Sequence, residues 1–144
     1  MGMFTEFYLR ANIKEGEFAD WLDKQINHGG GFEARFMEAD FPNDDRWYMP
    51  FIGGGAVYQE SRRPIFRRKA ADYGEPYHHQ LVLASSYKGG TFTADGFVAW
   101  ISPHLKMDDG EFLGYSLYED STDDGEQWRD HPVLYFHNRE PVHV

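Results

Sequence analysis

The residues that most invite a chemical interpretation are two glycine runs. "HGGG" begins at His28 and "GGG" begins at Gly53. In lipases a loop with the sequence HGGG supplies backbone donors to an oxyanion, but that chemistry also needs a nucleophile elbow, G-x-S-x-G, which this sequence lacks. A phosphate-binding loop needs G-K-[ST] before a helix, and strand-forming residues follow Gly53 instead. The first run therefore predicts a helix C-terminus and the second a bulge or tight turn, and we expect no catalytic residue.

The histidines and acids give no metal-binding spacing. His78 and His79 are neighbours on a predicted strand, so they point to opposite faces. The segment that starts at Asp120 resembles half of a calcium loop, but its twelfth position is His131, where a bidentate Glu is required. The chain has no cysteine, which excludes disulfides and thiolate zinc sites. We expect neither a metal nor a cofactor.

Basic charge is concentrated in one short stretch of an otherwise acidic chain. There are 24 Asp and Glu against 14 Lys and Arg, a net charge of −10, so we expect no direct contact with nucleic acid. In the stretch "RPIFRRK", Pro64 predicts an edge strand. Period-two alternation places Arg63 and Arg67 on one face with Ile65. These charges either protect the edge from aggregation, meeting acids of the C-terminal part, or contact an acidic partner.

Acids outnumber bases in the C-terminal third, where they gather in two loops. The loops flank the predicted strand "EFLGYSLY" and would lie roughly 25 Å apart at about 3.3 Å per residue. Two clusters at this spacing could engage two basic patches on a protein that normally holds nucleic acid; alternatively, they only keep the chain soluble. The candidate binding acids are Asp108, Asp109, Asp120, Asp123, Asp124 and Glu126.

Hydrophobic periodicity supplies the elements that would position these residues. Two amphipathic helices are expected at 15–31 and 93–106; Thr91 or Thr93 would cap the second, and Pro103 would kink it or end it early. Alternating patterns predict strands at 3–14, 46–51, 55–61, 63–69, 77–88, 111–120 and 131–138.

This order of elements predicts a single α+β domain over residues 1–144. Short connections between consecutive strands favour an antiparallel sheet of five to six strands, with both helices on one face and a ferredoxin-like, split βαβ arrangement as the candidate topology. No apolar run approaches 18 residues and the N-terminus does not resemble a signal peptide, so we expect a cytoplasmic protein without a membrane span.

Several patches together resemble a group of small phage and prophage proteins of unassigned function. They are "FTEFYLRANIK", "FPNDDRWYMPFIGGGAVY", and "GEFLGYSLYED" followed by "HPVLYFHN". The basic run "RRPIFRRK" is not part of that pattern. The resemblance implies a phage or prophage origin and hence a host-cell cytoplasm; it supplies no catalytic residue.

Two function hypotheses follow. The first is a non-enzymatic, phage-associated binding protein whose acidic surface engages a host protein, such as a defence or nucleic-acid-binding factor. The second is a small-molecule binder or weak enzyme with a pocket between sheet and helices, lined by some of the 12 Phe, 9 Tyr and 4 Trp. A flat acidic face would favour the first and a deep pocket the second. The sequence specifies neither the partner nor the oligomeric state.

Overall fold

Alternating burial along β1 (Phe4–Ile13) distinguishes a core-facing side of the sheet from a side with more exposed side chains. The computed structural model describes residues 4–28, 49–52, 64–69, 78–88, 91–118 and 132–144. On β1, Phe7 and Leu9 are fully buried, whereas Tyr8 is half-buried and Arg10 is exposed. Because successive strand residues point to opposite faces, one side of the sheet faces the core and the other does not.

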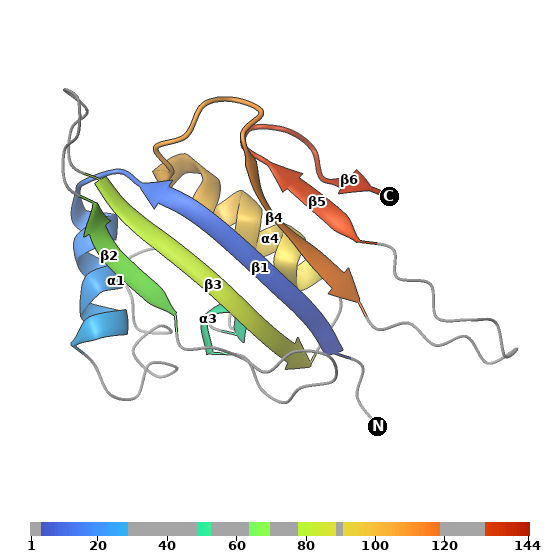
Figure 1. Cartoon of the computed structure of the whole chain (residues 1–144), viewed down its shortest axis with the longest axis horizontal. Helices are drawn as coiled ribbons and strands as arrows, with labels where there is room; N and C mark the ends of the chain where they lie inside the picture. The colour runs from blue at the N-terminus through green and yellow to red at the C-terminus, as the bar shows by residue number, and fades with distance from the viewer. Residues whose placement is uncertain (1–3, 29–48, 53–63, 70–77, 89–90, 119–131) are drawn as a thin grey trace, which may run out of the picture.

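Six strands form one antiparallel sheet in the order β2-β3-β1-β4-β5-β6 (Figure 1). β2 runs parallel to β1 with β3 between them, and β4 runs parallel to β3 with β1 between them. These two split βαβ units give the ferredoxin-like strand order that the sequence suggested, and β5 and β6 extend the sheet beyond β4. The remaining strands are β2 (Ile65–Lys69), β3 (His78–Lys88), β4 (Phe112–Tyr118), β5 (Val133–Phe136) and β6 (Val142–His143).

Two helices cover the same face of the sheet, as predicted (Figure 1). α1 (Glu17–Asn27) carries two acids in its first turn, near the positive end of the helix dipole, and buries Phe18 and Leu22. α4 (Thr91–Ile101) gives way to a 3₁₀ turn, η1 (Ser102–His104), because Pro103 cannot continue an α-helix. None of the described helices is long and apolar enough to span a bilayer.

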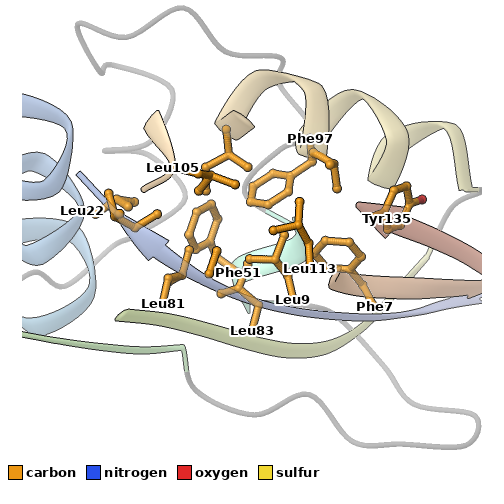
Figure 2. Packing of buried hydrophobic residues seen from close by; sticks show 14 of the residues in the cluster. Phe7, Leu9, Leu22, Phe51, Leu81, Leu83, Phe97, Leu105, Leu113 and Tyr135 are labelled. Carbon is orange, nitrogen blue, oxygen red and sulfur yellow. The ribbon is translucent and has the colours of Figure 1, made fainter. Parts of the chain in front are cut away.

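The core between the sheet and α4 is filled by aromatic and aliphatic side chains (Figure 2). The ring of Phe97 on α4 meets Phe7 edge-on at 5.6 Å between centroids, and it meets Phe51 in the same way at 5.2 Å. Leu9 and Leu113 pack beside them, both essentially without solvent exposure. The described side chains therefore pack into one continuous apolar core at the centre of this layer.

Two predictions about helices and strands are corrected by the structure, and a third lies outside the described residues. The predicted strand at 46–51 is wrong in its described part, because residues Met49–Ile52 form a short helix, α3. Pro50 suits a first helical turn, where its missing N–H costs no hydrogen bond, and Phe51 anchors this turn in the core. Thr91 and Thr93 both lie inside α4, so neither precedes it as a cap. The predicted strand at 55–61 lies outside the described residues.

The basic edge strand is confirmed in its described part. β2 stands at one end of the strand order, with Phe66 buried and Ile65 and Arg67 exposed. Arg68 is paired with Glu15, just before α1, at 2.9 Å. Both side chains are about half exposed, so this ion pair adds little stability.

Candidate functional site

The sheet face opposite α1 and α4, here called the open face, carries a continuous apolar row. Cross-strand pairing aligns Tyr8 with Ala84 on one side and with Tyr115 on the other. Tyr115 is paired in turn with Leu134, and Leu134 with Val142. We call these five residues, one from each of β3, β1, β4, β5 and β6, the central row.

Aromatic rings dominate the open face beside and within the central row. Tyr8 and Tyr115 stack at 6.1 Å with 20° between their planes. At the beginning of β4, the rings of Phe112 and Phe136 meet with 5.5 Å between centroids and 61° between planes. Offset and edge-on arrangements are the favourable ones for aromatic pairs, so these rings form a stable, amphipathic surface.

A β-bulge and a glycine bring β4 close enough to β1 to form this surface. The register shifts between Phe112 and Gly114, so Leu113 is the extra residue and turns into the core. A Cβ on Gly114 would lie 1.9 Å from the Tyr8 carbonyl oxygen, so only glycine fits at this position. The close approach places Tyr115 directly beside Tyr8.

Exposed apolar side chains concentrate on the open face. Among the described residues, the large hydrophobic side chains with the highest exposure are Ile65 (50%), Phe112 (51%), Val142 (44%) and Val144 (64%). The first three lie on the open face by register. Val144 continues the alternation of Val142, two residues further along the chain. Exposed apolar groups that gather on one face mark an interaction surface, whereas scattered ones need no explanation.

Polar groups line one end of the open face. The guanidinium of Arg67 donates from Nε (3.1 Å) and from a terminal nitrogen (2.8 Å) to Oε1 of the buried Gln80. A shallow pocket of about 400 Å³ lies beside this pair and is also lined by Arg10, Asn12 and Glu111. Arg67, predicted as a binding residue, therefore lies on the open face; Arg63 is outside the described residues.

Charges of both signs flank the tyrosines along β1. Glu6 and Arg10 each lie two residues from Tyr8 on the same face. Burial, followed by the nearby Glu6 carboxylate and then Tyr8, raises the pKa of Tyr115 above its ordinary value. Tyr115 therefore stays neutral at physiological pH and acts as an apolar ring with a hydroxyl tip.

Part of the predicted acidic site lies in the turn just before β4, which we call the acidic turn. Asp108, Asp109 and Glu111 are exposed. The Glu111 carboxylate accepts the Asp108 N–H at 2.9 Å, and Asn138 donates to Asp109 at 2.6 Å. A hollow of about 520 Å³ beside the turn is lined by Asp108 and Glu111 and also by Lys14 and Lys106, so it carries charges of both signs. The other predicted acids lie outside the described residues: Asp120, Asp123, Asp124 and Glu126.

A polar network lies on the opposite side of the sheet, under α4. The buried hydroxyl of Tyr135 donates to Asp95 at 2.5 Å and shares a 2.8 Å hydrogen bond with Ser116. Burial, together with the hydrogen bond to Asp95, raises the pKa of Tyr135 far above the ordinary tyrosine value. A tyrosine that cannot ionise serves as a fixed donor, so we interpret this network as a structural link between α4 and β5.

One serine and one histidine approach each other without forming a catalytic arrangement. Ser102 Oγ lies 3.4 Å from Nδ1 of the buried His137, and 3.5 Å from Oδ1 of Asn138. Both distances are at the limit for hydrogen bonds. Among the described residues, no carboxylate accepts a hydrogen bond from the His137 ring to orient it, as a nucleophile–base pair requires. The contact ties η1 to the end of β5.

Two other described histidines, His104 and His79, make packing contacts. His104 stacks on Phe18 at 3.9 Å, and His79 stacks on Phe66 at 4.9 Å. Burial and then the nearby Lys14 lower the pKa of His104. The described part of the chain contains no group of three or more His, Asp or Glu that could hold a metal ion.

Comparisons of the chain with models of protein families, with curated proteins and with solved structures give no match in any of the three. The resemblance to phage and prophage proteins stays a prediction.

The sequence interpretation missed the residues that make the open face prominent. Tyr8, Tyr115, Phe112 and Phe136 all stand in strands that were predicted. Their pattern was ambiguous, because aromatic and aliphatic residues occupy both faces of β4 and β5. Only the pairing of non-consecutive strands, β1 with β4, brings these rings together.

Proposed function

We propose that the protein is a non-enzymatic binding protein whose open face is its main protein-contact surface. The observation that carries the proposal is the concentration of exposed and half-exposed apolar and aromatic side chains on the sheet face opposite α1 and α4. Tyr, Phe and Arg are enriched in protein interfaces, where rigid rings bury much area at low entropic cost. A face of this composition favours a protein partner.

The acidic turn is a second contact in this proposal. The exposed carboxylates of Asp108, Asp109 and Glu111 stand at one end of the open face, in a chain with a net charge of −10. Such a field speeds the approach of a basic partner and sets its orientation more than it adds affinity. With the phage origin that the sequence resemblance implies, this partner is a host protein, and its inhibition is the biological role.

The alternative, a small-molecule binder or weak enzyme, has less support. Its pocket was expected between sheet and helices, where Phe7, Phe51 and Phe97 pack edge-on. The hollows beside the described residues are instead half-open: one lies on the open face beside Tyr8 and Phe112, one beside the acidic turn, and one beside α4.

Affinity capture from a bacterial lysate, with variants as baits, tests the proposal. Phe112→Asp places a charge in the apolar surface; Ala99→Asp adds the same side chain to the exposed side of α4 and is the matched control. We expect a protein that is retained by the wild type and by Ala99→Asp but lost with Phe112→Asp. A captured protein that binds all three baits equally would show that the open face is not the contact surface.

A further inference from the structure

The pocket on the open face beside Tyr8 and Phe112 contains a buried amide, and the partners of this amide indicate what the pocket can bind. The pocket has a volume of about 400 Å³ and is lined on its polar side by Arg10, Asn12 and Gln80. We call it the Gln80 pocket. The Gln80 side chain is only 6% exposed. Because a buried polar group without a hydrogen bond costs free energy, each polar atom of this amide should have an identifiable partner.

Arg67 fixes the orientation of the Gln80 amide. β2, β3 and β1 lie side by side, and their pairing puts Arg67, Gln80 and Asn12 in one row across the sheet (Figure 1). Arg67 donates two hydrogen bonds to Oε1 of Gln80. A guanidinium has no acceptor, so the atom that faces it is the amide oxygen, and the amide nitrogen is directed elsewhere. Gln80 lines the pocket and Arg67 does not, so this nitrogen is the Gln80 group that remains to face the pocket.

Two donors of the Gln80 pocket are unused within the described part of the chain. No described residue accepts a hydrogen bond from the Gln80 amide nitrogen. The exposed guanidinium of Arg10 forms no ion pair with a described acid. Arg10 is paired with Val82, so it is a diagonal neighbour of Gln80, about 7–8 Å away, and both side chains can reach one ligand group. A buried donor beside an unpaired cation favours an acceptor that carries negative charge.

The other residues of the Gln80 pocket favour a carboxylate among the possible anions. Glu111 lines the same pocket, so a doubly charged phosphate is repelled more strongly than a carboxylate, which carries one charge. The two oxygens of a carboxylate match the guanidinium of Arg10 and leave acceptor capacity for the Gln80 amide. The rings of Tyr8 and Phe112 border the site, so an apolar group next to the carboxylate can pack on them.

We propose that the Gln80 pocket binds an acidic side chain of the protein that docks on the open face, and that Arg10 and the Gln80 amide hold its carboxylate. This inference rests on the proposed function, because it names the group that the partner inserts into that face. The pocket lies between the aromatic rings and the acidic turn, which contact the same partner. A side chain within the partner's surface therefore fits this place better than a chain end.

The pocket and the acidic turn together determine how the partner is oriented. The acidic turn attracts basic groups, whereas the Gln80 pocket takes an acid, so the partner presents one acidic side chain beside basic ones. Exchanging the two contacts would bring like charges together, which costs affinity for a partner in the wrong orientation.

NMR titration of the full chain with blocked dipeptides tests the proposal, with the side-chain N–H signals of Arg10 and Gln80 as the readout. The probe is acetyl-Phe-Glu-amide, which presents an acidic side chain beside a ring, and acetyl-Phe-Gln-amide is its uncharged counterpart. We expect the Glu peptide to shift both signals and to bind at least about tenfold more tightly than the Gln peptide, because hydrogen bonds to a charged group are the stronger ones. Acetyl-Phe, whose carboxylate ends the chain, should bind more weakly than the Glu peptide.

Two variants locate the interaction in the pocket. Arg10→Gln removes the exposed cation. Gln80→Glu keeps an oxygen for Arg67 and replaces the amide donors with a second carboxylate oxygen. Each should weaken binding of the Glu peptide at least about tenfold, whereas Lys24→Gln, the same loss of charge on the exposed side of α1, should have no effect. Because Arg10 is at the surface, its variant keeps the test decisive if Gln80→Glu is less stable.

Several results would overturn the inference: equal affinity for the Glu and Gln peptides, tighter binding of acetyl-Phe, or an Arg10→Gln variant that binds like the wild type. Stronger binding of the Glu peptide by Gln80→Glu would also overturn it. The lysate capture separates this inference from the proposed function. If Phe112→Asp loses a captured protein that Arg10→Gln retains, the proposed function stands and the acidic side chain is wrong. If no captured protein depends on Phe112 or on Arg10, both fail.

Discussion

At the scale of single residues, the buried Tyr135 hydroxyl connects a helix to the sheet. Tyr135→Phe removes its hydrogen bonds to Asp95 and Ser116 and leaves the fully buried Ser116 hydroxyl without this partner. We expect the free energy of unfolding to fall by about 1–3 kcal/mol. Urea titration checks this, with Tyr118→Phe as the control, because the Tyr118 hydroxyl has no hydrogen bond to a described residue. Equal losses in both variants would contradict the structural role of the network.

The partly buried His104 side chain should make the free energy of unfolding depend on pH. Its pKa is lowered in the folded state, first by burial and then by Lys14, so just below pH 6.5 the unfolded chain binds more protons than the folded one. Stability should therefore rise with pH through this window and fall on acidification. His104→Phe, which keeps the stacking on Phe18, should lose less stability than the wild type between pH of about 7.5 and 5. Identical losses in urea titrations at the two pH values would contradict this assignment.

At the scale of elements, the contact between β1 and β4 depends on a missing side chain. Gly114→Ala would place a Cβ 1.9 Å from the Tyr8 carbonyl oxygen, and the backbone of a central strand cannot retreat easily. We expect a loss of at least about 3 kcal/mol in unfolding free energy. Gly110→Ala meets nothing nearer than 3.7 Å and should cost only about 1–2 kcal/mol, for its positive φ of 83°. Thermal unfolding of both variants checks this order, and a larger loss at Gly110 would contradict it.

The elements also show which features local sequence can predict. Period-two alternation located β1, β2, β4 and β5, and Pro103 marked the end of α4, because these signals act within a few residues. The short helix at Met49–Ile52 was missed because the burial of Phe51 against Phe97, a distant residue, gives it a place in the core. The candidate surface was missed for the same reason, since Tyr8 and Tyr115 are far apart in the chain and meet only through strand pairing.

At the scale of the whole molecule, the acidic turn should control the rate of encounter with a basic partner. Asp108→Asn with Asp109→Asn lowers the negative charge while keeping side-chain size. We expect slower association with a captured basic partner at 0.1 M salt and no difference at 1 M, where the screening length falls from about 10 Å to about 3 Å. Stopped-flow measurements check this against Glu17→Gln with Asp20→Asn, exposed acids of α1. Association that ignores both salt and the turn would contradict a steering role.

The central claim is that the open face is the surface that binds protein, and side-chain oxidation by hydroxyl radicals tests it most directly. The reactivity of Ile65, Phe112, Tyr115 and Val142 should be compared between the free protein and the complex that it forms with a captured protein. The account predicts protection of these side chains on association and no change at Pro103, which is exposed on the helix side. Protection at Pro103 with unchanged reactivity at Phe112 and Tyr115 would contradict it.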